Sequence, residues 1–204
     1  MIDLRVAQHL GMGEVRQWAE RRGNQAALVM GGGPSLEGDF ELVMESGLDP
    51  FLISVKQHAL IYLMHREGFK PDACCFLEDP NAPDQAELRV ALMVAPEVYL
   101  VSPFDGWTNV RIDEPWWQGG FSSSLAVWFA CAAGFEQVLL AGMDCYQGPR
   151  AYWYDRPGYS HPCTRSHLED NLRAWAPAFM LVEGADRIRA VSGPLVEVFG
   201  RWLP

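Results

Sequence analysis

The stretch that decides the fold of this chain is Ala27-Leu28-Val29-Met30-Gly31-Gly32-Gly33-Pro34-Ser35-Leu36, an apolar run that ends in three glycines. The run is typical of a buried strand, and Pro34 with Ser35 indicates the start of a helix, because proline suits the first helical turn. Glycines let the main chain approach an anion, and the N–H groups at a helix start point toward it. The stretch is therefore a candidate phosphate-binding turn. It also fits a strand-to-helix turn that needs glycine for backbone reasons alone, since it matches neither the dinucleotide fingerprint nor a Walker loop.

The composition favours one globular domain. Of the 204 residues, 49% are hydrophobic and 21% are charged, as in ordinary soluble proteins. A formal charge of −10 argues against a nucleic-acid partner, which would need a basic face. The five cysteines form no disulfide framework, no signal pattern begins the chain, and no apolar run reaches the ~20 residues of a membrane span. We therefore expect a cytoplasmic protein without a membrane span.

Beyond the glycine turn, apolar strands alternate with helices. Residues 1–24 form an N-terminal helical cap, which Gly11 and Gly13 are expected to break into two short helices. Strands are predicted at 25–30, 50–55, 72–77, 97–101, 137–141 and 187–191, and helices at 34–46, 57–67, 81–93, 121–133, 165–181 and the chain end. This alternation predicts a single Rossmann-like α/β domain over residues 1–204, with a mostly parallel six-stranded sheet and helices on both faces.

Parallel sheets of this kind bind ligands beyond the carboxyl ends of their strands. Besides the glycine turn, the residues that follow the predicted strands are Lys56-Gln57, Glu78-Asp79-Pro80, 102–105 and 142–146. We expect them to meet at one edge of the sheet, together with an aromatic active-site loop over residues 144–163. The polar residues thus gather on the side of the glycine turn.

Several of these residues suit a nucleotide site, each with an ordinary structural alternative. Ser122 and Ser123 start an apolar helix and either cap it or bind ligand oxygens. Asp144 could hold a ribose hydroxyl, a base amino group or Mg²⁺, and the tyrosines after it could stack on a base or simply pack on the surface. His161 is a candidate general acid or base, although loop histidines are more often structural.

Metal chemistry is a separate hypothesis. Glu78 and Asp79 could bind Mg²⁺ beside a polyphosphate, with Asp144 as a third carboxylate, or Asp79 could simply start the next helix. The spacing of His161, Cys163 and His167 matches no standard zinc pattern. Trp116-Trp117 could line an acceptor pocket or belong to the core.

Three stretches together resemble one superfamily: 31–36 (Gly-Gly-Gly-Pro-Ser-Leu), 71–80 (Pro-Asp-Ala-Cys-Cys-Phe-Leu-Glu-Asp-Pro) and 134–144 (Gly-Phe-Glu-Gln-Val-Leu-Leu-Ala-Gly-Met-Asp). It contains the DUF115 domain of unknown function, the archaeal 6-hydroxymethylpterin diphosphokinase-like proteins and the flagellin glycosyltransferases. Over 142–155 the chain is similar to the bacterial sialyltransferases of glycosyltransferase family 42. The lid of those enzymes is shortened here to 156–160, and Gly32 stands where they have asparagine.

The sialyltransferase resemblance implies roles for particular residues. Tyr146 and Tyr152 would hold the donor phosphate, Ser122 would contact the nucleotide, and His161 would be the general base. With the sheet-edge rule, the expected nucleotide-binding residues are Gly31, Gly32, Gly33, Pro34, Ser35, Lys56, Asp79, Ser122, Ser123 and Asp144.

The resulting hypothesis is a transferase that uses a CMP-sugar donor and a small-molecule or glycan acceptor, and requires no cofactor. One alternative is a diphosphokinase of the pterin type, which would use ATP with Mg²⁺ held by Glu78, Asp79 or Asp144. The other is a nucleotide-binding protein that has lost catalysis. The sequence leaves the oligomeric state open.

Overall fold

A computed structural model of the protein describes residues 12–21, 23, 25–95, 98–104, 107, 110, 121–145, 152–154 and 184–204. Its strands are β1 (Ala26–Met30), β2 (Phe51–Val55), β3 (Ala73–Cys75), β4 (Tyr99–Val101), β5 (Gln137–Ala141) and β6 (Ile188–Ala190). Its helices are α1 (Met12–Arg21), α2 (Leu36–Glu45), α3 (Lys56–Met64), α4 (Ala86–Val94), α5 (Ser122–Ala133) and α7 (Val196–Phe199), with short 3₁₀ turns η1 (Pro83–Gln85) and η3 (Ala185–Arg187). Each strand overlaps a predicted one, although β3 is three residues shorter than predicted, and α4 begins five residues after the predicted helix start.

The strands form one six-stranded sheet in the order β4-β3-β2-β1-β5-β6, and every pair is parallel. The chain proceeds outward from β1 to β4 and then returns to the other side of β1 with β5. The order therefore reverses between β1 and β5, which is where α/β sheets of this type bind ligands. The predicted α/β, Rossmann-like fold is confirmed.

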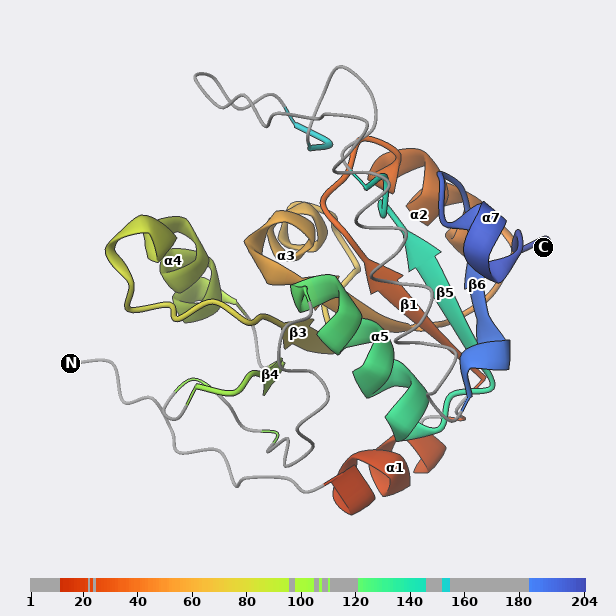
Figure 1. Ribbon diagram of the computed structural model, residues 1–204, viewed down its shortest axis with the longest axis horizontal. Helices are drawn as coiled ribbons and strands as arrows, with labels where there is room; N and C mark the ends of the chain where they lie inside the picture. The colour runs from red at the N-terminus through yellow and green to blue at the C-terminus, as the bar shows by residue number, and fades with distance from the viewer. Residues whose placement is uncertain are drawn as a thin grey trace.

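Helices cover both faces of the sheet. Figure 1 shows α5 running across one face with α1 at its far end, while α2 and α3 lie on the other face and α4 lies beside α3. Crossover helices run antiparallel to the strands they connect, so α2, α3 and α5 all begin at the carboxyl edge of the sheet. The starts of three helices thus gather beside the glycine turn.

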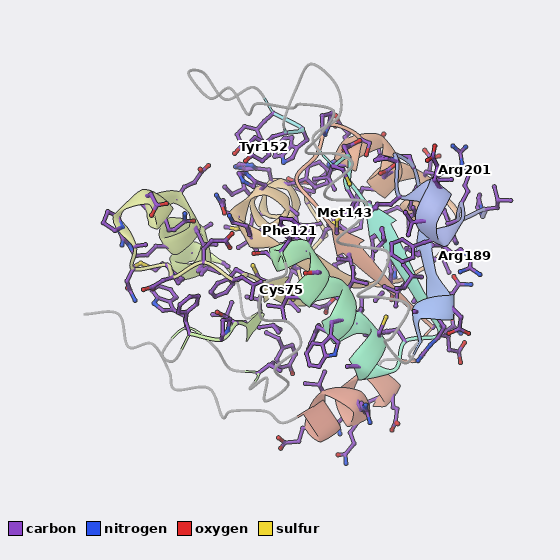
Figure 2. All side chains as sticks on the ribbon, in the orientation of Figure 1. Cys75, Phe121, Met143, Tyr152, Arg189 and Arg201 are labelled. Carbon is purple, nitrogen blue, oxygen red and sulfur yellow. The ribbon has the colours of Figure 1, made fainter. Side chains whose placement is uncertain are left out.

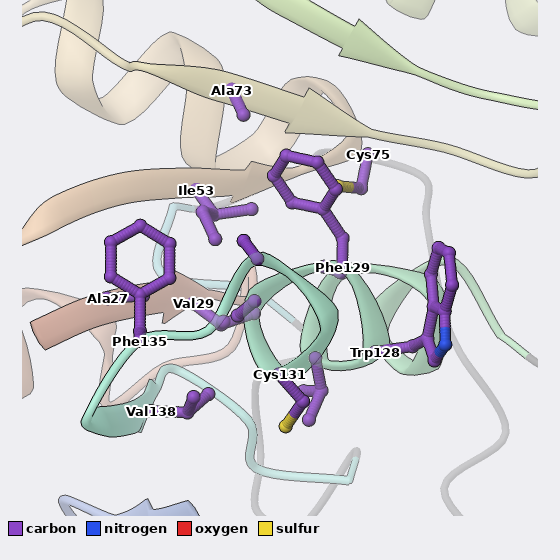
Figure 3. Close-up of a cluster of buried hydrophobic side chains, with 14 of the residues drawn as sticks. Ala27, Val29, Ile53, Ala73, Cys75, Trp128, Phe129, Cys131, Phe135 and Val138 are labelled. Carbon is purple, nitrogen blue, oxygen red and sulfur yellow. The ribbon is translucent and has the colours of Figure 1, made fainter. Parts of the chain in front are cut away.

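The glycine-turn strand is apolar throughout because it is buried on both faces. Ala27 and Val29 of β1 belong to the core under α5, where Phe129 and Phe135 pack (Figure 3). Leu28 belongs to the opposite core, which packs against α2 and α3. Alternate residues of a strand point to opposite faces, so a strand with helices on both sides needs an apolar residue at every position.

The predicted break at Gly11 and Gly13 lies where the described helix begins. Helix α1 starts at Met12 and has Gly13 in its first turn, while Gly11 lies outside the described residues, so the division into two short helices stays a prediction. An added Cβ at Gly13 would meet no atom within 4 Å, and helices tolerate an isolated glycine at a cost of about 1 kcal/mol. Val15 and Ala19 pack this helix into the core under α5.

The helix predicted at 165–181 lies outside the described residues, as do Gly11 and Trp116-Trp117. In the part of the chain that is described, no helix has both the length and the hydrophobicity needed to cross a bilayer.

Candidate functional site

A cavity of about 230 Å³ opens at the carboxyl edge of the sheet, at the point where the strand order reverses. Its walls come from the ends of β1, β2, β3 and β5, from the start of α5 and from the segment 152–154. Figure 2 labels three of its lining residues, Phe121, Met143 and Tyr152. Among the predicted site residues, those that line it are Gly31, Gly32, Gly33, Lys56, Glu78, Ser122, Ser123, Asp144 and Tyr152.

Three predicted residues do not line the cavity. Pro34 and Ser35 follow the glycines at the start of α2 and are not among the residues that line the cavity. Asp79 accepts a hydrogen bond at 2.9 Å from the backbone N–H of Asn81, so it caps a turn that precedes η1 and does not start the helix that the sequence predicted at 81–93. Tyr146 and His161 lie outside the described residues, so their predicted roles stay predictions.

The glycine turn is packed tightly against the end of β5. The N–H of Gly31 donates to Ala141 O at 2.8 Å, and the N–H of Gly33 donates to Gly142 O at 2.9 Å. A Cβ on Gly31 or Gly33 would overlap Gly142 O, and a Cβ on Gly32 would lie 2.5 Å from His58 Cβ. The glycines are thus required by close packing around the cavity. Within the described structure, the N–H of Gly32 has no acceptor, so it is the donor that this turn presents to a ligand.

A carboxylate occupies the start of α2. Asp144 Oδ2 accepts from the backbone N–H and the hydroxyl of Ser35, both at 3.0 Å. The Ser35 hydroxyl also lies 2.9 Å from Asp39 Oδ2, and the buried Asp39 accepts from the N–H of Gly142 at 2.9 Å. Burial raises the pKa of Asp144, the hydrogen bonds from Ser35 oppose that rise, and the charge of Asp39 adds to it. A ligand phosphate could use this helix start only by displacing Asp144.

A second polar cluster joins β2, β3 and α5. Lys56 Nζ pairs with Glu78 Oε1 at 2.8 Å, and the Ser122 hydroxyl donates to Glu78 Oε2 at 2.7 Å. The same hydroxyl accepts from the N–H of Leu77 at 2.9 Å. The hydroxyl of Ser123, in contrast, makes no hydrogen bond within the described structure. Ser122 therefore holds the end of β3 to α5, while Ser123 lines the cavity without a structural partner.

Two lining residues have left-handed backbone conformations without being glycine. The φ angles are 56° at Lys56 and 48° at Cys145. Each costs about 1–2 kcal/mol for a residue with a Cβ, and such strain is concentrated at functional sites. Burial raises the pKa of the Cys145 thiol to about 12, with the charge of Asp144 adding to the rise, so this thiol is not a nucleophile at neutral pH.

His58 is the main residue that sequence reasoning missed. It lies in the first turn of α3, lines the cavity and is only 6% exposed. Its ring stacks on Tyr152 with centroids 4.0 Å apart, and its Nδ1 lies 2.9 Å from Tyr154 Oη. The strand-end rule selected Lys56-Gln57 and stopped one residue short. Because the helix starts directly at Lys56, its third residue, His58, still reaches the site.

The three carboxylates of the Mg²⁺ alternative have separate partners: Glu78 faces Lys56, Asp79 caps a turn and Asp144 caps α2. Over the described ranges, no group of three or more His, Cys, Asp or Glu side chains is arranged to hold a metal ion. Cys163 and His167 lie outside those ranges.

Comparisons with protein-family models, with curated proteins and with solved structures found no significant match to this chain. The function therefore has to be argued from the site itself.

Proposed function

We propose that this cavity binds the nucleotide part of an activated sugar donor, and that the protein is a nucleotide-sugar-dependent glycosyltransferase. The observation that carries the proposal is the convergence of an aromatic wall, an ammonium group and the N–H of Gly32 in one cavity at the strand-order reversal. Concave sites with aromatic walls and a few placed polar groups are typical of small-molecule binding.

Charge favours a donor with one phosphate. Among the described residues that line the cavity, Lys56 alone carries a permanent positive charge, and Glu78 and Asp144 add negative charge. A triphosphate carries several negative charges and normally needs bound cations or several basic side chains. A CMP-sugar donor presents a single phosphodiester, so it needs less positive charge from the cavity than a triphosphate does. This is why the glycosyltransferase hypothesis ranks above the diphosphokinase.

The aromatic residues suit the rest of such a donor. Tyr152 is 9% exposed and stacks on His58, so its ring is held in place before a ligand arrives. Phe121 is 47% exposed at the start of α5, where an apolar ring gains by covering a base or a sugar face. The resemblance assigns the general base to His161, and that assignment remains a prediction.

The test is a thermal-shift screen with CMP, CDP, ATP and GTP, each with Mg²⁺ and with EDTA. A ligand at ~100 times its Kd adds roughly 2.7 kcal/mol to the free energy of unfolding. For a chain of this size, that raises Tm by about 5–10 °C. We expect CMP to give this shift in EDTA. A shift that occurs only with ATP and Mg²⁺ would favour the diphosphokinase, and no shift with any nucleotide would contradict nucleotide binding altogether.

A matched pair of variants tests the role of the cation. Lys56→Met removes the ammonium from the cavity, and Lys70→Met removes an exposed one that does not line it. We expect the first to abolish most of the CMP shift and the second to leave it unchanged. Equal CMP shifts in the two variants would show that Lys56 does not contact the phosphate.

A further inference from the structure

His58 belongs to a hydrogen-bonded chain of three side chains that ends at the cavity. Its Nδ1 lies 2.9 Å from Tyr154 Oη, and Tyr154 Oη lies 3.3 Å from Glu87 Oε1. The three residues come from α3, from the segment 152–154 and from α4, which are far apart in sequence. The fold thus connects a carboxylate, a phenol and an imidazole by consecutive hydrogen bonds, and of the three residues only His58 lines the cavity.

These hydrogen bonds set the tautomer of the neutral imidazole. In its contact with Glu87, the Tyr154 hydroxyl is the donor and Glu87 Oε1 the acceptor. The phenol oxygen can then only accept from His58, which requires a hydrogen on Nδ1. The lone pair of the neutral ring therefore lies on Nε2, the nitrogen that does not face Tyr154.

The ring is also held in one orientation. It stacks on Tyr152 with an interplanar angle of 24°, and the Cβ of His58 packs against Gly32 so closely that no side chain fits there. The indole N–H of Trp153 donates to the backbone carbonyl of His58 at 3.0 Å. A base that is fixed by stacking and hydrogen bonds loses little freedom when a substrate arrives.

We infer that His58 is a general base of this site and that Tyr154 and Glu87 position it; this inference rests on the proposed function. Nε2 takes the proton of the acceptor hydroxyl as its oxygen bonds to the anomeric carbon of the donor. The bond between that carbon and the phosphate oxygen breaks, and its electron pair leaves with the nucleoside monophosphate. The imidazolium then returns its proton to water. Lys56 lines the same cavity and can stabilise the charge that develops on the phosphate.

The first test reads the protonation state of His58 and needs no ligand. In protein labelled with ¹⁵N-histidine, long-range ¹H–¹⁵N spectra at neutral pH distinguish the two neutral tautomers, and His58→Gln assigns the signal. We expect His58 in the Nδ1–H form, and Tyr154→Phe should remove that preference. His65, which is exposed, provides the internal control. An Nε2–H tautomer in the wild-type protein would overturn the inference.

The second test measures CMP release from CMP-N-acetylneuraminic acid, with water as the acceptor. General bases contribute about 10²–10⁴ in rate, so His58→Gln should lower kcat by about 100-fold or more with KM within about threefold. Tyr154→Phe should lower kcat by less than His58→Gln does, because it removes the preference of His58 for the Nδ1–H tautomer but leaves the imidazole in place. His161→Gln, in parallel, tests the base that the resemblance implies.

The outcomes separate this inference from the proposed function. A wild-type protein that shows no thermal shift with any nucleotide contradicts the proposed function, and it contradicts the base assignment as well. The tautomer measurement on His58 needs no ligand, so its result stands independently of the thermal-shift screen. A protein that shifts with CMP but keeps wild-type kcat in His58→Gln retains the nucleotide site and refutes His58 as the base. A wild-type protein that binds CMP but releases no CMP from the donor also refutes His58 as the base.

Discussion

Gly33→Ala is the substitution that tests most directly how the cavity is built. The φ angle of Gly33 lies outside the left-handed region, so alanine can adopt the backbone conformation of this residue without strain. The added Cβ, however, would lie 2.7 Å from Gly142 O and 2.9 Å from Asp144 Cγ, and closer still to Asp144 Oδ2. Two of these three atoms belong to the carboxyl group that caps α2, so that group has to move.

The expected loss combines two effects and one small gain. Overpacking a tight site costs about 1–3 kcal/mol. Moving Asp144 weakens its hydrogen bonds from Ser35, and hydrogen bonds to a charged group contribute about 1.5–3 kcal/mol. Replacing glycine by alanine reduces the conformational entropy of the unfolded chain, which raises the free energy of unfolding by about 0.4–1 kcal/mol. The free energy of unfolding should therefore fall by about 3 kcal/mol, which lowers Tm by about 6–12 °C.

Urea unfolding followed by tryptophan fluorescence measures this change, and Gly38→Ala is its control. Gly38 lies inside α2, where an added Cβ would meet nothing within 4 Å. Alanine there should stabilise the protein by about 0.5–1 kcal/mol. The two variants thus make the same chemical change with opposite expected signs. If Gly33→Ala unfolds at the same urea concentration as the wild type, the described packing of Asp144 on the glycine turn is wrong.

Three further predictions concern stability. Ser122→Ala should lower the free energy of unfolding by about 2 kcal/mol, because it removes a bond to a carboxylate and a partner of the Leu77 N–H, whereas Ser123→Ala should stay within about 0.5 kcal/mol in the same urea assay. Lys56→Gly should be more stable than Lys56→Met by about 1 kcal/mol, because both lose the ammonium but only glycine relieves the left-handed strain; equal urea midpoints would argue against strain at this position. Burial raises the pKa of Asp144 above its usual 3.8, so its contribution to stability is present at low pH and is lost as pH rises through the folded pKa. Asp144→Asn should therefore gain stability relative to the wild type between about pH 3 and pH 7, and urea midpoints at the two pH values check the sign.

The secondary structure of the described residues was largely predictable because the strands are buried on both faces. Such strands are continuous apolar runs, and glycine or proline punctuates them, as at the end of β1. The exact bounds were less predictable, since α4 begins at Ala86 rather than at the predicted residue 81.

The site was predictable at the level of strand ends, and less so at the level of individual contacts. The strand-end rule found Lys56, Glu78 and Asp144, and the predicted helix start found Ser122; all four residues line the cavity. It could not show that Asp144 would occupy the start of α2, because that contact joins residues 109 positions apart. A local sequence pattern does not show which backbone N–H groups will find a hydrogen-bond acceptor elsewhere in the folded chain.

The sequence by itself therefore determined the fold class, the order of the elements and the edge of the sheet where polar residues collect. These follow from burial and turn chemistry, which act on neighbouring residues. Only the tertiary structure decided what the glycines do, since they make room for Gly142, Asp144 and His58 as well as offering one N–H to a ligand. It also decided that His58 meets Tyr154, because an imidazole acquires its tautomer and its direction from partners that only the folded chain brings within hydrogen-bonding distance.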